Sequence, residues 1–312
     1  MQTFGGQSVS WPHFDRKSAA PPALGAVITT VHAQIIGGGT LAPGLTLPRV
    51  GGTTDSPVVL TPCDRRVQLT GPGLSAIAAS AAHDTLVVLD PGHGGHADGA
   101  LAQDGTREAD VVLALAQQVR TDLTGRVSRV VMTRTSDIDV SLGFRVALAD
   151  ALRADLAVSV HLDANPRTTT SPVPGTQVYA SVADPHGRRA AGVIYQAERR
   201  YIDTLSARVH DHWAARQNHG ALYRLGSDGD YYYLLRNSHV TWVINEAMFI
   251  TDPNEEALVT TPSVRTGLAS AIAGGILDYV GTPDPGSGWR TPIPQPPDPP
   301  APGGSGTCVD PS

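Results

Sequence analysis

The chain has 312 residues, of which 41% are hydrophobic and 17% charged, and this apolar share is enough for a sizeable buried core. The formal net charge of −6 argues against a protein that neutralises nucleic-acid phosphates, so we expect no nucleic-acid partner. No run of 18 apolar residues occurs, so we expect no transmembrane segment. Glycine and proline gather toward the two ends, which predicts one folded core between flexible N- and C-terminal extensions.

Residues 1–84 show no sustained helical or strand periodicity and are rich in glycine, threonine and proline. We interpret them as a leader and linker, with one short strand at residues 58–60 and a brief helix at residues 74–82. An export signal is a further interpretation of this stretch. Two basic residues precede a mildly apolar segment that ends near residue 33, but two prolines interrupt that segment.

From residue 85 onward, buried strands alternate with amphipathic helices. The first strand, Leu86-Val87-Val88-Leu89, is apolar throughout, as in a strand that is covered on both faces. It ends in a turn of proline and three glycines that carries His93. Further strands are expected at residues 127–133, 156–161, 176–180 and 240–244, and helices at residues 107–123, 145–154, 187–217 and 263–279. This alternation predicts an α/β fold with a single, mainly parallel sheet that helices cover on both faces.

Both flanks of this core carry a cysteine. After residue 281 the chain is rich in proline, so we expect residues 282–312 to form an extended tail that joins no core. Cys63 and Cys308 could form one disulfide if the protein is exported, or they could be two free thiols. The sequence leaves both states open, and neither cysteine has the neighbours that a structural zinc site requires.

Four residues with metal-binding or proton-transfer chemistry fall at the ends of predicted elements. His93 and His161 follow buried strands, Glu108 opens a helix, and Glu246 follows the last strand. Because the carboxyl ends of parallel strands meet at one edge of a sheet, these residues can share a cleft. Two histidines and a carboxylate suit a hydrolytic zinc site with an open position for water, and a second carboxylate can move the proton.

Each of these residues also has an ordinary structural explanation. Glu108 can stabilise the start of a helix through the helix dipole. His161 can be a hydrogen-bonded core histidine, and Glu246 can pair with an arginine. Spacing alone does not decide between the two explanations, because the set is spread from residue 93 to residue 246.

As an ordered set, the motifs resemble those of the zinc-dependent N-acetylmuramoyl-L-alanine amidases of the type-3 family. The motifs that carry the resemblance are Leu89-Asp90-Pro91-Gly92-His93-Gly94-Gly95, Arg107-Glu108, Thr133-Arg134, Arg145, Ser159-Val160-His161, Leu234-Leu235-Arg236 and Asn245-Glu246-Ala247-Met248-Phe249-Ile250. The resemblance covers about residues 85–280, and we take residues 85–281 as the catalytic domain.

The resemblance implies a twisted sheet of about six strands and one bound zinc ion (Zn2+). It implies that His93, Glu108 and His161 are the zinc ligands and that Glu246 is the catalytic carboxylate. The substrate would be peptidoglycan, cut at the amide between N-acetylmuramic acid and the L-alanine of the stem peptide. Such an enzyme is expected to be a monomer that is secreted or held in the cell envelope, or a phage lysin made in the host cytoplasm.

Two alternatives stay open beside this interpretation: a metallopeptidase that acts within the stem peptide, and a wall-binding module without catalysis. The sequence also departs from the family pattern next to the site. Leu162 and Asp163 stand where a small residue and an asparagine are usual, and Asn245 stands where an aliphatic residue is usual. Residues 231–233, three tyrosines, could stack on sugar or peptide at the rim of the cleft, or pack beside the last strand.

Overall fold

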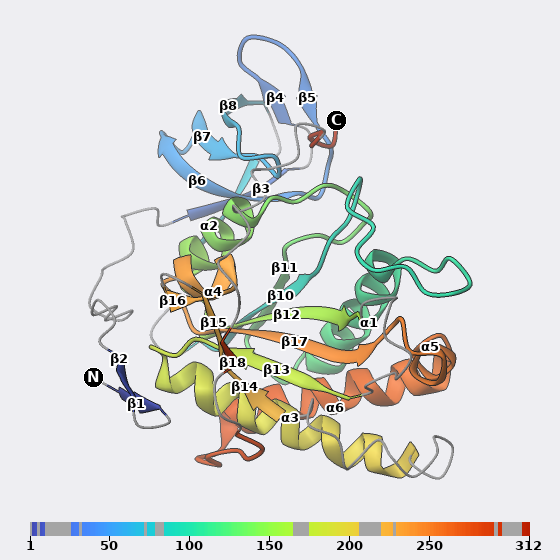
Figure 1. Ribbon diagram of the computed structural model, residues 1–312. Coiled ribbons are helices and arrows are strands. Elements are labelled where there is room, and N and C mark those ends of the chain that lie inside the picture. Colours follow the sequence, from blue (N-terminus) through green and yellow to red (C-terminus); the bar gives the residue numbers. More distant parts are fainter. Residues whose placement is uncertain are drawn as a thin grey trace.

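The computed structural model describes residues 2–4, 7–9, 26–30, 33–71, 74–78, 84–164, 175–205, 220–226, 229–289, 293–294 and 308–312. Within these residues the chain forms two large sheets, one of six strands and one of seven. Figure 1 shows the seven-stranded sheet at one end of the molecule, beside α2 (Leu142–Leu152), and the six-stranded sheet with α3 (Pro185–Leu205) and α6 (Pro262–Gly281) below it. Two small sheets are β1 (Gln2–Phe4) with β2 (Gln7–Val9), and β15 (Arg224–Gly226) with β16 (Gly229–Asp230) and β18 (Ile293–Pro294).

The six-stranded sheet has the order β11-β10-β12-β17-β13-β14. Its strands are β10 (Leu86–Pro91), β11 (Arg129–Met132), β12 (Leu156–Asp163), β13 (Gln177–Ala180), β14 (Gly220–Leu222) and β17 (Trp242–Phe249). Four of the five strand pairs are parallel, and β13 runs antiparallel to β17. All six residues of β10 are buried, which explains why this strand is apolar along most of its length.

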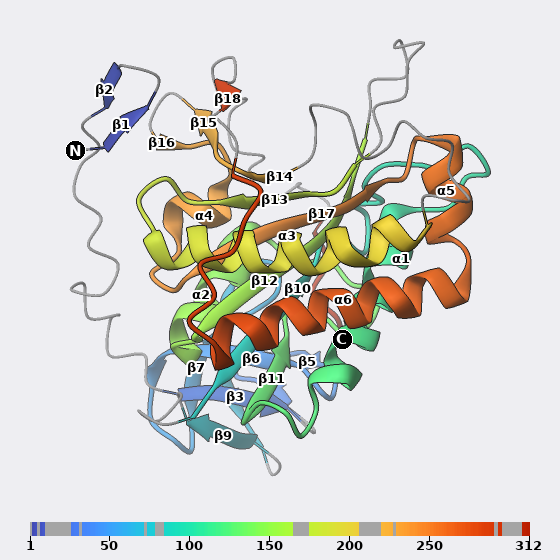
Figure 2. The same ribbon diagram turned by 90° about the horizontal axis from the view of Figure 1, so that it is seen from below.

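Helices cover both faces of this sheet. One face packs against α1 (Glu108–Leu123), α3 (Pro185–Leu205) and α6 (Pro262–Gly281), and the other packs against α2 and α4 (Tyr233–Asn237). Figure 2 shows α3 and α6 side by side along the sheet, with α5 (Pro253–Val259) leading into α6. The prediction of an α/β fold is confirmed. Among the described helices, none combines the length and the apolar character needed to cross a membrane.

The prediction of a single sheet, with residues 1–84 as a leader and linker, is wrong. Residues 26–30, 33–70 and 74–78 contain an antiparallel sheet in the order β5-β4-β8-β7-β6-β3-β9. Its strands are β3 (Ala26–Thr30), β4 (Ala33–Ile35), β5 (Thr40–Leu41), β6 (Thr46–Gly52), β7 (Pro57–Leu60), β8 (Arg66–Thr70) and β9 (Leu74–Ala78). The strand predicted at residues 58–60 lies in β7. The helix predicted at residues 74–82 is wrong as far as Ala78, which ends β9, and residues 79–82 lie outside the described residues.

The seven-stranded sheet shares a buried core with α2. Buried side chains from six of its strands belong to one core with Leu148 and Leu152 of α2; they are Val27, Ile28, Ala33, Leu41, Leu47, Val59 and Leu69. In β7 buried residues alternate with partly exposed ones. Because each short strand supplies one or two core residues, no period is long enough to be read from the sequence.

The predicted export signal overlaps this sheet. Residues 10–25 of that segment lie outside the described residues, but the segment continues into β3. Val27 and Ile28 of β3 are 0% and 1% exposed. Cleavage near residue 33 would therefore remove a strand that is part of the core.

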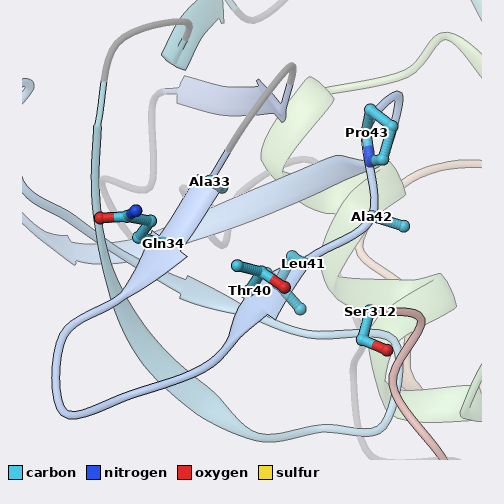
Figure 3. A pocket seen from close by; sticks show the side chains of 7 residues that line it. All are labelled: Ala33, Gln34, Thr40, Leu41, Ala42, Pro43 and Ser312. Carbon is cyan, nitrogen blue, oxygen red and sulfur yellow. The ribbon is translucent and has the colours of Figure 1, made fainter.

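The proline-rich tail also packs more closely than predicted. Trp289 stacks on Tyr223, with 4.9 Å between the ring centroids, and β18 pairs with β15. Residues 308–312, which we call the C-terminal clasp, return to the seven-stranded sheet, where Cys308 is disulfide-bonded to Cys63. Figure 3 shows the end of the clasp beside a pocket of about 410 Å³ that β4 and β5 line. The tail is anchored by these aromatic, strand and disulfide contacts, so the prediction of a tail outside any core is wrong for these segments.

Candidate active site

The turn after β10 carries the first predicted ligand. His93 has a positive φ of 58°, and the glycines that follow it have φ values of 114° and 60°, so the chain bends back sharply there. A Cβ atom on Gly92 would lie 2.1 Å from the His161 ring. Glycine is therefore required at this position for the turn to approach β12 so closely.

Two buried arginines hold this turn. Arg145 Nη2 donates a hydrogen bond of 2.8 Å to the His93 carbonyl oxygen, and Arg145 Nη1 lies 2.5 Å from Asp90 Oδ1. Arg134 Nη2 donates to the Gly92 carbonyl oxygen at 2.7 Å and to the first turn of α1 at 2.8 Å. The turn and the start of α1 are therefore fixed relative to each other, as a metal site requires of the elements that carry its ligands.

The three predicted ligands meet at the edge of the sheet where β10 and β12 end. Glu108 Oε2 lies 3.1 Å from His93 Nε2, and Glu108 Oε1 lies 3.0 Å from His161 Nδ1. One possible donor atom from each of the three residues lies within 4.8 Å of the other two. Two imidazole nitrogens and a carboxylate oxygen are a donor set that suits zinc and leaves a fourth position open.

Glu108 is held in its ionised form. The residue is 3% exposed, and burial alone would raise its pKa, but hydrogen bonds and charge from His161 and His93 outweigh burial and lower the pKa well below its usual range. The backbone nitrogens of Ala100 and Leu162 also donate to this carboxylate, at 2.9 and 3.0 Å. An ionised, oriented carboxylate is the form in which glutamate binds a metal.

Glu246 lies beside this group on the neighbouring strand. Glu246 and His161 are directly opposite each other in the pairing of β12 with β17. Glu246 is 8% exposed, and within the described part of the chain its Oε2 has no hydrogen-bond partner. Burial raises its pKa to about 8; the positive charge of His161 opposes this rise, and the carboxylates of Asp163 and Glu108 add to it. A carboxyl group with such a pKa is suited to proton transfer near neutral pH.

The structure thus brings together all four residues that the sequence analysis singled out, and it also explains one departure from the family pattern. Asn245 points away from Glu246, to the other face of β17, where its Nδ2 donates a hydrogen bond of 2.8 Å to Glu198 Oε1. The Asp163 carboxylate accepts a hydrogen bond of 2.7 Å from the backbone nitrogen of Ala164.

Two residues near Glu246 were missed from the sequence. Gln177 lies directly opposite Glu246 in the pairing of β13 with β17. Arg224, on β15, lies close enough for its positive charge to act on Glu246. Neither residue belongs to a motif. Only the register between β13 and β17 could have pointed to Gln177, and this is the one antiparallel pair in the sheet.

Comparison with known proteins adds to this geometry. A family model described as N-acetylmuramoyl-L-alanine amidase matches residues 87–278. The chain is 31% identical over 225 residues to the N-acetylmuramoyl-L-alanine amidase AmiC of Neisseria meningitidis, with 63% of this chain and 53% of that protein covered. It is also 31% identical over 225 residues to AmiA of Salmonella typhimurium, with 62% and 75% covered. The chain therefore spans about half the length of the first relative and three quarters of the second.

A solved structure agrees with these sequence matches. The N-acetylmuramoyl-L-alanine amidase AmiC2 of Nostoc punctiforme superposes with a TM-score of 0.53 at 28% sequence identity. The match covers 63% of this chain and 97% of that one. The family match begins at residue 87, so the strands of the seven-stranded sheet lie outside that match.

Proposed function

Because the chain belongs to the N-acetylmuramoyl-L-alanine amidase family, as the match over residues 87–278 shows, we propose that it hydrolyses peptidoglycan. The bond that is cut is the amide between N-acetylmuramic acid and the L-alanine of the stem peptide. The observation that carries this proposal is the meeting of His93, Glu108 and His161 within 4.8 Å, next to the buried carboxyl group of Glu246.

The donor set fits one zinc ion, which His93, Glu108 and His161 would hold. When bound, zinc supplies Lewis-acid activation of the scissile carbonyl group and of the attacking water. Arg145 and Arg134 keep the turn of His93 in place through their bonds to backbone carbonyl oxygens. The ligands are therefore oriented by the fold before any substrate arrives.

Glu246 moves the proton in this reaction. Burial raises its pKa to about 8, so its carboxylate is a better acceptor for the proton of the attacking water than an exposed carboxylate would be. The same carboxyl group then returns the proton to the amine of L-alanine as the C–N bond breaks. Its Oε2 is not engaged by any described residue, which leaves that oxygen available for the transfer.

We further propose that the protein acts on the cell wall outside the cytoplasm. The disulfide between Cys63 and Cys308 is typical of proteins in oxidising compartments. A phage lysin made in the host cytoplasm would meet the same substrate after its release. The site chemistry is the same for both origins.

The test compares wild type with Glu246→Gln on purified peptidoglycan, each with and without a zinc chelator, and identifies the products by mass spectrometry. Wild type should release stem peptides that begin at L-alanine, and both the chelator and Glu246→Gln should lower the rate by at least about 100-fold. Glu246→Gln should still bind zinc, because Glu246 is not one of the three ligands. Asp203→Asn, at an exposed carboxylate of α3, is the control for the loss of a carboxylate and should keep the wild-type rate.

Other products would change the conclusion. Cuts between amino acids of the stem peptide would replace the amidase with a metallopeptidase. Binding to peptidoglycan without cleavage, by a protein that takes up no zinc, would replace it with a wall-binding module.

A further inference from the structure

The loop between the turn of His93 and the helix of Glu108, which we call the ligand loop (residues 97–107), lies close to both side chains. A Cβ atom on Gly99 would lie 2.6 Å from Glu108 Oε2 and 2.7 Å from His93 Cδ2. The next residue, Ala100, donates its backbone N–H to Glu108 Oε2 at 2.9 Å, and its carbonyl oxygen accepts a hydrogen bond of 2.9 Å from the Glu108 backbone nitrogen. The orientation of the Glu108 carboxylate therefore depends on where the ligand loop lies.

The base and the tip of the ligand loop are held differently. At the base, Arg107 Nη1 lies 3.0 Å from Asp98 Oδ1 and Arg107 Nη2 lies 2.6 Å from Asp137 Oδ2. Of the tip, residues 101–106, only Ala102 is buried, and one methyl group removes little apolar area from water. The tip therefore needs a further contact if it is to keep one position.

Glu256 of α5 supplies this contact. Its Oε2 accepts a hydrogen bond of 3.2 Å from the Gln103 backbone nitrogen, and its Oε1 accepts one of 3.2 Å from the Asp104 backbone nitrogen. Hydrogen bonds to a carboxylate are stronger than those between neutral groups, and here one carboxylate binds two successive N–H groups. Helix α5 follows shortly after β17, the strand that carries Glu246. Glu256 therefore connects the segment that carries Glu246 to the loop that lies against two of the proposed zinc ligands.

We propose that Glu256 is a positioning residue for the zinc site, an inference that rests on the proposed zinc-dependent function. Its carboxylate holds the tip of the ligand loop, the loop keeps the Ala100 N–H on Glu108, and Glu108 is thereby oriented for the metal. Loss of a group that orients a metal ligand weakens metal binding by about 10–100-fold. Glu256 acts through the loop rather than on Glu108 itself, so we expect an effect near the lower end of this range.

The experiment compares the zinc affinity of wild type and Glu256→Ala, both as the full chain freed of metal and titrated in zinc-buffered solutions. Glu256→Ala should raise the Kd for zinc about tenfold. The melting temperature of the metal-free protein should change by about 2 °C at most, because the residue is partly exposed. Glu256→Gln keeps one carbonyl oxygen and loses the charge, so its Kd should be intermediate. Hydrogen exchange of residues 97–107, followed by mass spectrometry, should be faster in Glu256→Ala than in wild type.

A matched control separates this effect from a general loosening of the helix that carries Glu108. Asp122 lies near the other end of α1, and its Oδ2 accepts a hydrogen bond of 2.7 Å from Ser270 Oγ of α6. Asp122→Ala therefore also removes a carboxylate that ties α1 to a neighbouring element, but it does so far along the helix from the site. This variant should keep the wild-type Kd for zinc and the wild-type hydrogen exchange of the ligand loop.

The outcomes for the two proposals are distinct. A wild-type Kd for zinc in folded Glu256→Ala, or a Kd raised as much in Asp122→Ala, would overturn the positioning role and leave the amidase function in place. If Glu256→Ala does not fold, Glu256→Gln decides the question: a raised Kd supports the role and a wild-type Kd overturns it. Wild type that binds zinc and does not cleave the amide of L-alanine would overturn the proposed function, and the Kd values would still decide the role of Glu256. Wild type that binds no zinc would overturn both.

Discussion

The two large sheets of this chain bury their strands in different ways. In the six-stranded sheet β10 is buried at every position, whereas in the seven-stranded sheet β7 alternates between buried and partly exposed residues. The parallel strands β10, β12 and β17 end at one edge of the sheet. The three proposed zinc ligands and Glu246 lie close together at that edge. Strands of an antiparallel sheet end alternately at opposite edges. This difference shows why the chemistry lies in the six-stranded sheet, since only there do several strand ends converge.

The two sheets nevertheless form one structural unit. Leu47 of β6 and Leu148 of α2 belong to the same buried core. The C-terminal clasp makes a second link, because the Val309 backbone nitrogen donates to Asp139 Oδ2 at 3.2 Å. Asp139 Oδ1 accepts a hydrogen bond of 2.9 Å from the backbone nitrogen of His96, in the loop that follows His93. The clasp, which is disulfide-bonded to Cys63, is therefore linked through Asp139 to the loop that follows His93, the first of the proposed zinc ligands.

Among the substitutions considered, the largest effect on zinc binding and on the amidase rate is expected at the sheet edge where the parallel strands end. Glu108→Gln should abolish zinc binding and lower the amidase rate by more than about 100-fold, because a neutral amide replaces the anionic ligand between two imidazoles. Metal analysis of the purified variant and the release of stem peptides would measure both effects. Full zinc content in Glu108→Gln would contradict the assignment of the ligand.

A second histidine–carboxylate pair provides the control for this prediction. His239 Nδ1 lies 2.9 Å from Asp150 Oδ2, in a geometry like that of His161 with Glu108. His239 precedes β17, at the opposite edge of the sheet from the site. His239→Gln should therefore keep the wild-type zinc content and rate.

The next effect concerns the shared core. Leu47 is 0% exposed, and Leu47→Ala should lower the free energy of unfolding by about 2–5 kcal/mol, or the melting temperature by roughly 5–15 °C. Because the core is shared, amidase activity should be lost at the same lowered temperature as the β-sheet signal in circular dichroism. Ile36→Ala, at a residue that is 52% exposed, should change the melting temperature little. Loss of the sheet signal alone, with activity retained, would show that the two sheets unfold independently.

Removal of the disulfide should lower the free energy of unfolding slightly less than Leu47→Ala does. Cys63 and Cys308 are 245 residues apart in sequence, so their bond restricts the unfolded chain strongly, and the double variant Cys63→Ser/Cys308→Ser should be less stable by about 2–4 kcal/mol. Calorimetry would measure the shift. A reductant should lower the melting temperature of wild type to that of the double variant and leave the double variant unchanged. Equal melting temperatures of oxidised wild type and the double variant would contradict this account of the clasp.

The six-stranded sheet and its site could largely be predicted from the sequence. Residues 86–89 are apolar without interruption because the strand is covered on both faces, and the rule that parallel strand ends converge was enough to group His93, His161 and Glu246. Arg224 could not be found in this way. It lies on a short hairpin after β14 and contacts Tyr231 and Tyr232, and no spacing in the sequence encodes that placement.

The seven-stranded sheet was missed for a different physical reason. β8 alternates polar and apolar residues over five positions and buries only Leu69, and this short alternation does not indicate which strands β8 pairs with. The small apolar residues of β9 suit a helix as well as a strand, and the pairing of β9 with β3 decides the outcome. Antiparallel pairing of such strands depends on the tertiary contacts with α2, which the local sequence does not specify.

The smallest predicted effect concerns Glu198, which binds Asn245 of β17 on the face of the sheet opposite Glu246. Glu198 of α3 is 0% exposed, and its carboxyl oxygens accept hydrogen bonds from Asn245 Nδ2 at 2.8 Å and Thr176 Oγ1 at 3.1 Å. Burial raises its pKa from 4.5 to about 8, although the two hydrogen bonds oppose the rise. The folded chain therefore holds this proton at pH values where the unfolded chain has released it. Its contribution to stability is complete below about pH 4.5 and is lost as the pH rises through about 8.

Glu198→Gln keeps a carbonyl oxygen for Asn245 and has no proton to lose. Between pH 5 and pH 9 the free energy of unfolding of wild type should therefore fall more than that of Glu198→Gln, by on the order of 1–3 kcal/mol. Urea unfolding of both proteins at pH 5, 7 and 9 measures the difference, and other titrating groups cancel because the two proteins share them. If the free energy of unfolding changes equally with pH in the two proteins, Glu198 is already ionised at pH 5. Asn245 would then anchor β17 to a buried charge, and Glu246, the next residue, would be held in place by an ionic hydrogen bond.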